Sequence, residues 1–448
     1  MNRGTGLIAA LLCMPALHAY AQQQSPPVLT LKEAQQTALA NRPLLRASQL
    51  SADSARQLTL QLQSGRYPQV LGSVTAATAT TENTVQDGKE VTLDTRIAAG
   101  SLNNPSVLWR AAAGLTVSQL VTDFGRTSSL VQSAQSNEAA QRYRVSATRA
   151  QILLEVDDAY LAVLEAQAVR RVAAKTVDAR KALLDRIAAL AKSKLKAELD
   201  VRFAQVNLDQ ARLLLLSADN AVEAAFARLS TSLGFRDTRR FTLVDRPDSP
   251  SPPIDLDSLL AQAIARRPEL ASLRADRDAA KKFVDAQKAL RYPIINVYGA
   301  AGAVPVGDDR FPQYYGAIGI NLNVPVFDGG KISALQQQAQ LQALTLSESL
   351  SETENSVVKA VRVAWLNANA GYQNIEITAH LQEASAQALN LAESRYNLGI
   401  TSIVELNQAQ LSAIDAEIVY SQARYRYLSA LTALDYQVGT LDVIDTGR

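Results

Sequence analysis

The chain has 448 residues, of which 47% are hydrophobic and only 5% aromatic, so it can bury a large core that is rich in alanine and leucine. Its 45 lysine and arginine residues nearly cancel 43 aspartate and glutamate residues. The formal charge of +2 argues against a protein that binds nucleic acid or an anionic membrane. With one cysteine and two histidines, the chain has no pattern for a zinc, thiol or multi-histidine site. We therefore expect neither a cofactor nor an enzyme.

Residues 1–21 predict a signal peptide. A positively charged start precedes the apolar run Leu7–Leu17, and Ala19-Tyr20-Ala21 has the small residues that precede cleavage. Leu12 stands where a lipobox would place a small residue before Cys13, so we do not expect lipidation. We expect cleavage after Ala21 and export of the mature chain across the inner membrane.

The next segment, residues 22–234, has a helical pattern, then a strand pattern, and then a helical pattern again. Helical spacing over Leu31–Ser64 predicts a helix with an early bend at Pro43. Tyr67–Thr80 and Val107–Val121 then predict a β-hairpin over residues 67–121, with the long loop Thr81–Pro105 between its strands.

Residues 127–233 contain neither glycine nor proline, which predicts helices of unusual length. A break near Lys192–Lys196 divides them into helices of roughly 65 and 35 residues, and the longer would span about 100 Å. Heptad-like spacing predicts that these helices pack as a coiled-coil bundle. Asp157 and Asp158 are neighbours that point apart on a helix, so we expect a solvated acidic pair.

After a linker at residues 235–253, the chain repeats itself over residues 254–439, before a tail at 440–448. Arg267-Pro268 and Tyr292-Pro293 match Arg42-Pro43 and Tyr67-Pro68 at one constant offset. Further along the chain, a second, shorter offset relates three residue pairs: Gly114 and Gly319, Tyr160 and Trp365, Gly234 and Gly439. The chain is therefore a tandem duplication.

The second repeat predicts the same elements as the first. They are a helix over Asp257–Leu290, a hairpin over residues 292–327 formed by Tyr292–Val304 and Gln313–Phe327, and long helices over residues 331–438 with a break at Asn397–Gly399.

The strands suggest a membrane sheet. From Ile318 to Val326, apolar residues alternate with glycine, asparagine and proline, as in outer-membrane strands. No later segment is apolar over the 18 or more residues of a transmembrane helix. Four strands cannot close a barrel with a lumen, whereas three chains would supply about twelve, so we expect a trimer.

Several segments resemble the TolC family of outer-membrane efflux and secretion channels. They are the two openings Ala38–Pro43 and Ala263–Pro268, the strand-to-helix junction Val326–Lys331, and the turn Arg395–Leu406. The resemblance covers nearly all of the mature chain. It implies a mostly α-helical homotrimer with a twelve-stranded β-barrel in the outer membrane and an α-helical tunnel in the periplasm. Such a protein is a passive duct for type I protein secretion or multidrug efflux.

The same resemblance implies partners and functional residues. The partners would be outer-membrane lipid, a periplasmic adaptor and an inner-membrane transporter. The two helix turns would form the docking tips, with Lys192, Lys194, Lys196, Tyr396, Leu398, Gly399, Ile400 and Thr401.

Just beyond the turns, Glu405, its repeat equivalent Asp200, and Gln408 are candidates for a gate or selectivity ring. Thr401 and Gln408 depart from the arginine and acid of the family's better-known member, and Lys194 stands where the second turn has Gly399. Glu405 and Asp200 could instead serve as favourable charges in the first turn of a helix.

Two other functions stay open at this stage. A periplasmic coiled-coil scaffold or adaptor would explain the long helices but not two hairpins per chain. A periplasmic enzyme would need catalytic side chains that the sequence does not show. The lysines at the first turn are either a solvated tip or a docking surface.

Overall fold

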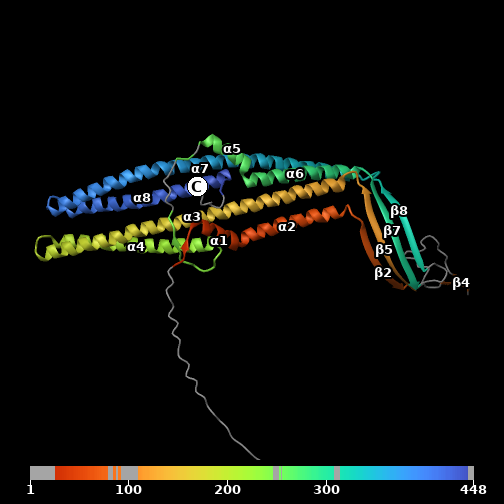
Figure 1. Cartoon of the computed structure of the whole chain (residues 1–448), viewed down its shortest axis with the longest axis horizontal. Helices are drawn as coiled ribbons and strands as arrows, with labels where there is room; N and C mark the ends of the chain where they lie inside the picture. Colours follow the sequence, from red (N-terminus) through yellow and green to blue (C-terminus); the bar gives the residue numbers. More distant parts are fainter. Residues whose placement is uncertain are drawn as a thin grey trace, which may run out of the picture.

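The computed structural model describes residues 26–78, 84–86, 89–91, 109–245, 252–253, 255–306 and 313–441. The expected signal peptide and most of the expected loop Thr81–Pro105 lie outside the described residues. The described part is elongated, with a β-sheet at one end and two helix turns at the other, joined by helices that run along the long axis (Figure 1).

The first repeat contains both helix and strand. Its main elements are α1 Leu31–Asn41, α2 Pro43–Ser64, β2 Gln69–Thr78, β5 Trp109–Thr122, α3 Arg126–Lys192 and α4 Glu198–Ser232. The expected bent helix Leu31–Ser64 is in fact two helices. Arg42 between them is extended, with φ −73° and ψ 116°, because a residue before proline avoids the helical region, and Pro43 then starts α2. Within the expected loop, β3 Thr84–Gln86 pairs with β4 Lys89–Val91.

The second repeat copies this order. Its elements are α5 Leu256–Arg266, α6 Pro268–Lys288, a short 3₁₀ turn Ala289–Arg291, β7 Ile294–Val306, β8 Tyr314–Asn323, α7 Lys331–Asn397 and α8 Ile403–Val438. The expected strand to Phe327 is too long, since β8 ends at Asn323. Pro325 lacks the amide hydrogen that would continue the ladder. The helices α3 and α7 both have 67 residues, which corresponds to about 100 Å.

The sheet is antiparallel and its strand order is β2-β5-β7-β8, so pairing of β5 with β7 joins the two repeats. Partners directly across the strands share one face of a sheet. One such row is Val70, Val117, Gly299 and Ile318. By this register, one face carries Val70, Val74, Leu115, Val117, Val297, Ile318, Ile320 and Leu322. The other face carries mainly small and polar residues such as Ser73, Thr116 and Asn321.

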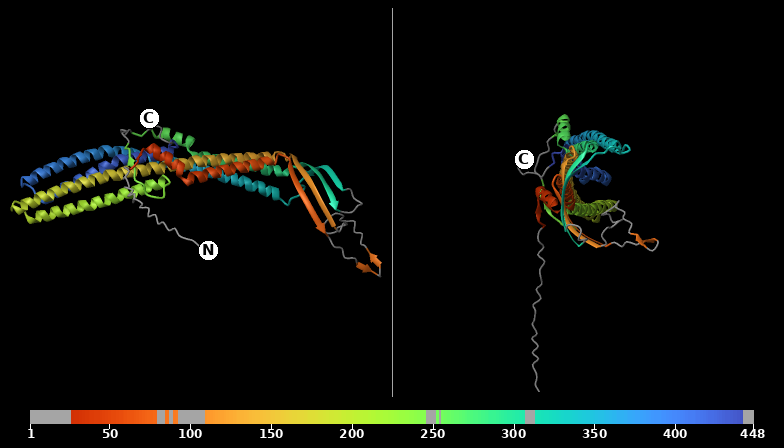
Figure 2. Two further views of the ribbon diagram at one scale, coloured as in Figure 1. Left: turned by 60° about the horizontal axis from the view of Figure 1, so that its bottom comes forward. Right: turned by 90° about the vertical axis from the view of Figure 1, so that its right-hand side faces the viewer.

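The helices pack in pairs along the long axis. The pair α3–α4 and the pair α7–α8 form the half distant from the sheet, and α2 and α6 flank α3 in the half near the sheet (Figures 1 and 2). Alanine is frequent among the buried residues and lets the helix backbones approach closely. Within the described ranges, none of the helices combines the length and apolar composition that a membrane crossing requires.

Near α1, the linker is bound to the start of the described chain. The strand β1 Val28–Leu29 pairs in parallel with β6 Thr242–Leu243. The fully buried Tyr160 of α3 holds this pair. Its hydroxyl lies 2.9 Å from the Leu29 carbonyl oxygen and 2.8 Å from that of Val244, and accepts a hydrogen bond from the Val244 amide at 2.9 Å.

The expectation of a solvated acidic pair at Asp157 and Asp158 is wrong. Asp157 is buried and accepts a hydrogen bond of 2.7 Å from the Gln35 amide on α1. Asp158 accepts one of 2.6 Å from the Ser429 hydroxyl on α8, and burial raises the pKa of its carboxyl. Because adjacent residues on a helix point apart, the two acids connect α3 to two different helices.

Candidate functional site

The two turns at the end distant from the sheet close with the same geometry. Lys194 and Gly399 are both left-handed, with φ of 56° and 74°. In each turn, the amide of this residue bonds the carbonyl three residues before it, at 2.9 and 3.1 Å. The amide of the next residue bonds the carbonyl five residues before it, at 2.9 Å in both turns. This is the Schellman closure of a helix, so Lys194 does adopt the conformation that glycine provides at the second turn.

A small apolar core lies beneath the turns and joins all four long helices. Tyr396 is only 4% exposed and belongs to this core. Its buried members are Ile187, Ala204, Ala392, Tyr396, Ile403 and Leu406. The tips are therefore held to one another within the chain and are not independent hairpins.

Tyr396 connects the two turns through polar contacts as well. The Lys196 ammonium lies 3.9 Å from the centre of the Tyr396 ring and donates a 3.4 Å hydrogen bond to the Tyr396 carbonyl. Burial and the nearby Asp200 carboxylate raise the pKa of the Tyr396 hydroxyl to about 12. Lys196 and Asp200 from the first repeat thus face the same side chain of the second repeat.

Glu405 is bound within its own chain. Its carboxylate lies 3.3 Å from the Arg395 guanidinium and accepts a hydrogen bond from the Thr401 hydroxyl. Glu405 and Asp200 are the third residues of α8 and α4, where a carboxylate interacts favourably with the helix dipole. The structure thus brings Thr401 and Glu405 together, while Gln408 is exposed one turn further along α8.

Two contacts near the tips had no sequence signal. The Asn207 amide donates a 2.6 Å hydrogen bond to the Asn407 side chain, which joins α4 to α8. The Arg395–Glu405 pair crosses the second turn. Neither pair joins positions that are equivalent between the repeats, so the duplication could not reveal them.

Of the predicted docking residues, Lys192 and Lys194 on the first turn and Leu398, Gly399 and Ile400 on the second are exposed. Ser193 and Leu195 of the first turn and Asn397 of the second are exposed as well. Among the residues that the structure describes, no three acidic, histidine or cysteine side chains converge as metal ligands would.

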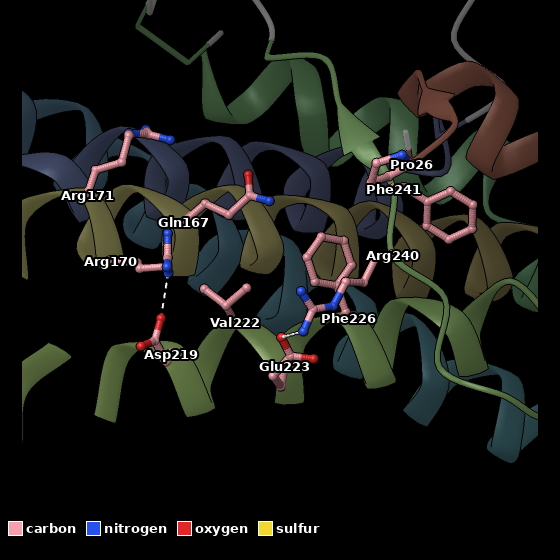
Figure 3. Close-up of a pocket in the computed structure, with 10 residues that line it drawn as sticks. All are labelled: Pro26, Gln167, Arg170, Arg171, Asp219, Val222, Glu223, Phe226, Arg240 and Phe241. Carbon is pink, nitrogen blue, oxygen red and sulfur yellow. Dashed lines mark hydrogen bonds and ion pairs between the residues drawn. The ribbon is translucent and has the colours of Figure 1, made fainter. Parts of the chain in front are cut away.

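A cavity of about 580 Å³ lies away from the tips, under the linker. Val222 and Phe226 of α4 and Phe241 of the linker supply apolar side chains (Figure 3). Arg170 pairs with Asp219 at 2.5 Å, and Arg240 pairs with Glu223. These ion pairs tie α3 and the linker to α4, so the cavity belongs to the middle of the bundle and not to the tips.

The architecture defines the class of the protein. An exposed apolar sheet face at one end of a helical bundle about 100 Å long, with exposed turns at the other end, is typical of an outer-membrane channel protein with a long helical part. The chain belongs to the outer membrane efflux protein family, whose model matches residues 34–235 and 259–440.

Known proteins agree with this assignment. Over 320 residues, the chain is 27% identical to the outer membrane protein TolC of Vibrio cholerae, covering 67% of this chain and 71% of that protein. A membrane protein from Pseudomonas aeruginosa has the same fold, with a TM-score of 0.77, 21% identity and coverage of 91% and 93%. The Campylobacter jejuni CmeC outer membrane channel has a TM-score of 0.78, 16% identity and coverage of 92% and 85%.

The resemblance to the TolC family and the mostly α-helical channel-tunnel fold are thereby confirmed. The chain is an outer-membrane component of an export system. Channels of this family are passive ducts and work in tripartite systems with an adaptor and an inner-membrane pump.

Proposed function

We propose that three copies of this chain form a passive export duct. The sheets close a twelve-stranded barrel in the outer membrane, and the long helices form a periplasmic tunnel. The helix turns dock to a periplasmic adaptor that an inner-membrane transporter drives. After removal of residues 1–21, the mature chain reaches the outer membrane. The observation that carries this proposal is the sheet, because it has two open edges and one apolar face.

The two outer strands of the sheet, β2 and β8, can each pair with a further strand. Within the described residues, β2 and β8 each pair with one neighbouring strand of the sheet, which leaves the other side of each without a partner in the chain. An open edge exposes backbone amides and carbonyls that cannot remain unpaired in lipid. If β8 of one copy pairs with β2 of the next, three copies leave no edge.

The apolar face of the sheet fits lipid. Val74 is 84% exposed and Ile318 is 85% exposed, and both lie on this face by the register of the strands. A soluble sheet would bury such side chains, whereas a membrane barrel turns them outward and keeps the polar face for the lumen.

The helices also present surface that further copies would cover. Leu213 and Leu216 of α4 are exposed, as are Leu341 and Leu344 of α7. Neighbouring copies that pack side by side would bury these leucines, at about 25 cal/mol per Å² of apolar area. The tunnel would then end at the tips, where rings of Asp200 and Glu405 supply acidic groups around the opening.

A poreless periplasmic scaffold would not need an apolar, edge-exposed sheet. A charge placed on the lipid face separates the two functions. We expect Ile318→Lys to reduce trimer in the outer membrane, because a lysine near the bilayer centre costs about 2–4 kcal/mol. Asn321→Lys, on the opposite face of β8, is the matched control and should assemble normally.

Trimer is measured as the slow-migrating band in unheated samples of outer-membrane fractions on a denaturing gel. Heating should convert this band to monomer. Absence of any heat-sensitive trimer band, or equal tolerance of the two lysines, would favour the scaffold.

A further inference from the structure

The cavity under the linker has an apolar floor that is fixed by the core. Val222 and Phe226 of α4 are 8% and 4% exposed and belong to the largest core cluster, and Phe241 of the linker packs against the same cluster. These side chains are therefore held in place before anything enters the cavity. Its volume of about 580 Å³ lies within the range of about 300–1,000 Å³ that is typical of small-molecule sites.

The rim of this cavity carries hydrogen-bond donors that the chain does not use (Figure 3). Arg170 bonds Asp219 through its Nε, and Arg240 bonds Glu223 through one terminal nitrogen, although a guanidinium has five N–H groups. Arg171 is exposed, and its side chain forms no hydrogen bond or ion pair within the described residues. Three arginines thus stand against two carboxylates, which leaves one positive charge in excess at the rim.

The second repeat has aromatic side chains at the equivalent place. At the shorter offset between the repeats, Val222 corresponds to Tyr427, and Gln167, which also lines the cavity, corresponds to Tyr372. Tyr427 is fully buried, and its ring centre lies 5.7 Å from that of Tyr372. The first repeat therefore has a cavity where the second repeat packs two rings, and an aromatic ring suits the spacing of these helices.

The positive charge is also confined to the first repeat. At the same offset, Arg170 and Arg171 correspond to Ile375 and Glu376. Neither the space nor its charge is thus a general consequence of the duplication, and the two features occur together at one place.

We propose that this cavity binds an aromatic carboxylate. The ring of the ligand lies against Phe226 and Phe241, in the position that Tyr427 takes in the second repeat, because aromatic rings gain from offset or edge-to-face contact. The carboxylate accepts hydrogen bonds from the unused N–H groups of Arg170 and Arg171, and such charge-assisted bonds are stronger than those between neutral groups. The site lies in the middle of the bundle and is separate from the tips.

The test measures binding of 2-naphthoate to the full-length chain purified in detergent, by isothermal titration calorimetry with the heat of empty micelles subtracted. We expect one site per chain. The neutral 2-naphthylmethanol should bind about tenfold more weakly or less, because it lacks the charge, and the aliphatic octanoate should also bind more weakly. If either compound binds as tightly as 2-naphthoate, the assigned class of ligand is wrong.

Arg171→Gln separates the site from non-specific binding. It should lower the affinity about tenfold through loss of a charged donor. Because Arg171 has no hydrogen bond or ion pair within the described residues, its replacement breaks no such contact in the fold. Arg186→Gln, at an exposed position of α3 outside the cavity, is the matched control and should bind as the unmodified protein does. Equal effects of the two substitutions would contradict the inference.

A further variant copies the second repeat. Gly371 lies against Tyr427, where an added Cβ would come within 3.3 Å of the ring, and the equivalent of Gly371 in the first repeat is Ala166. Val222→Tyr combined with Ala166→Gly should therefore fill the cavity with a tyrosine ring and abolish binding, while the circular-dichroism spectrum is retained. The inference is overturned if the folded double variant still binds 2-naphthoate. It is also overturned if the unmodified protein does not bind, as when a neighbouring copy covers the cavity.

Discussion

Tyr160 offers a sharp test of how the middle of the molecule is held. Its hydroxyl makes three contacts of 2.8–2.9 Å to Leu29 and Val244, and its side chain is fully buried. Tyr160→Phe keeps the ring but removes the hydroxyl, so the Val244 amide retains only its 3.4 Å bond to the Leu29 carbonyl. Loss of one good donor and one good acceptor in a buried site should cost about 2 kcal/mol.

The effect should be concentrated in the linker, because β6 is fastened to α3 through this hydroxyl. We expect trypsin to cleave after Arg236, Arg239 or Arg240 several times faster in Tyr160→Phe than in the unmodified protein. Thermal unfolding followed by circular dichroism should show a lower midpoint. Tyr143→Phe, at an exposed position of the same helix, is the control and should change neither measurement. Unchanged linker cleavage in Tyr160→Phe would refute the idea that this tyrosine holds the strand pair.

Three further outcomes are expected. Gly399→Val places a β-branched residue at φ 74°, at a cost of about 1–2 kcal/mol. This variant should weaken export while gels still show trimer. Full export at normal protein level would contradict this prediction. Glu405→Ala breaks the ion pair between Arg395 and Glu405, whose side chains are 45% and 46% exposed, so the free energy of unfolding should change by less than about 1 kcal/mol. The preference of the channel for cations in planar bilayers should fall. Lower stability with unchanged selectivity would instead mean that Glu405 only interacts with the helix dipole. Burial raises the pKa of Tyr160 and Tyr396 from 10.0 to about 12, so with rising pH the unfolded chain releases these protons before the folded chain does. The free energy of unfolding should therefore be unaffected by these groups below pH 10 and should fall towards pH 12. Thermal unfolding measured against pH should show a smaller decrease in Tyr160→Phe.

The duplication made much of the fold predictable. A run without glycine or proline predicts a long helix because nothing in it interrupts the backbone ladder, and α3 and α4 fill that run except for the turn. The repeat offset placed Lys194 opposite Gly399, and the two turns do close alike. Alternation at Ile318 and Ile320 gave the face of β8 but not its end, because Pro325 stops pairing while the apolar alternation continues.

Contacts between segments that are far apart in the sequence could not be predicted from it. Each strand of the β1–β6 pair has two residues, too few for any periodic pattern. Asp157 looked like a surface acid because its partner Gln35 is 122 residues away, and nothing local signals that an amide will reach it. At the tips, Asp200 and Glu405 were found through the repeat, whereas Arg395 and the Asn207–Asn407 pair have no equivalent in the other repeat.

The equal lengths of α3 and α7 restrict which insertions and deletions the long helices can tolerate. Both have 67 residues, and α4 and α8 differ by one residue, although few side chains are shared between the repeats. One added residue would rotate every following side chain by about 100° around its helix and move the turn by about 1.5 Å. Substitutions can therefore accumulate independently in the two halves, but an insertion in one long helix would misalign it against its neighbours. A longer version would need about seven residues, or roughly two turns and 10 Å, in all four helices at once.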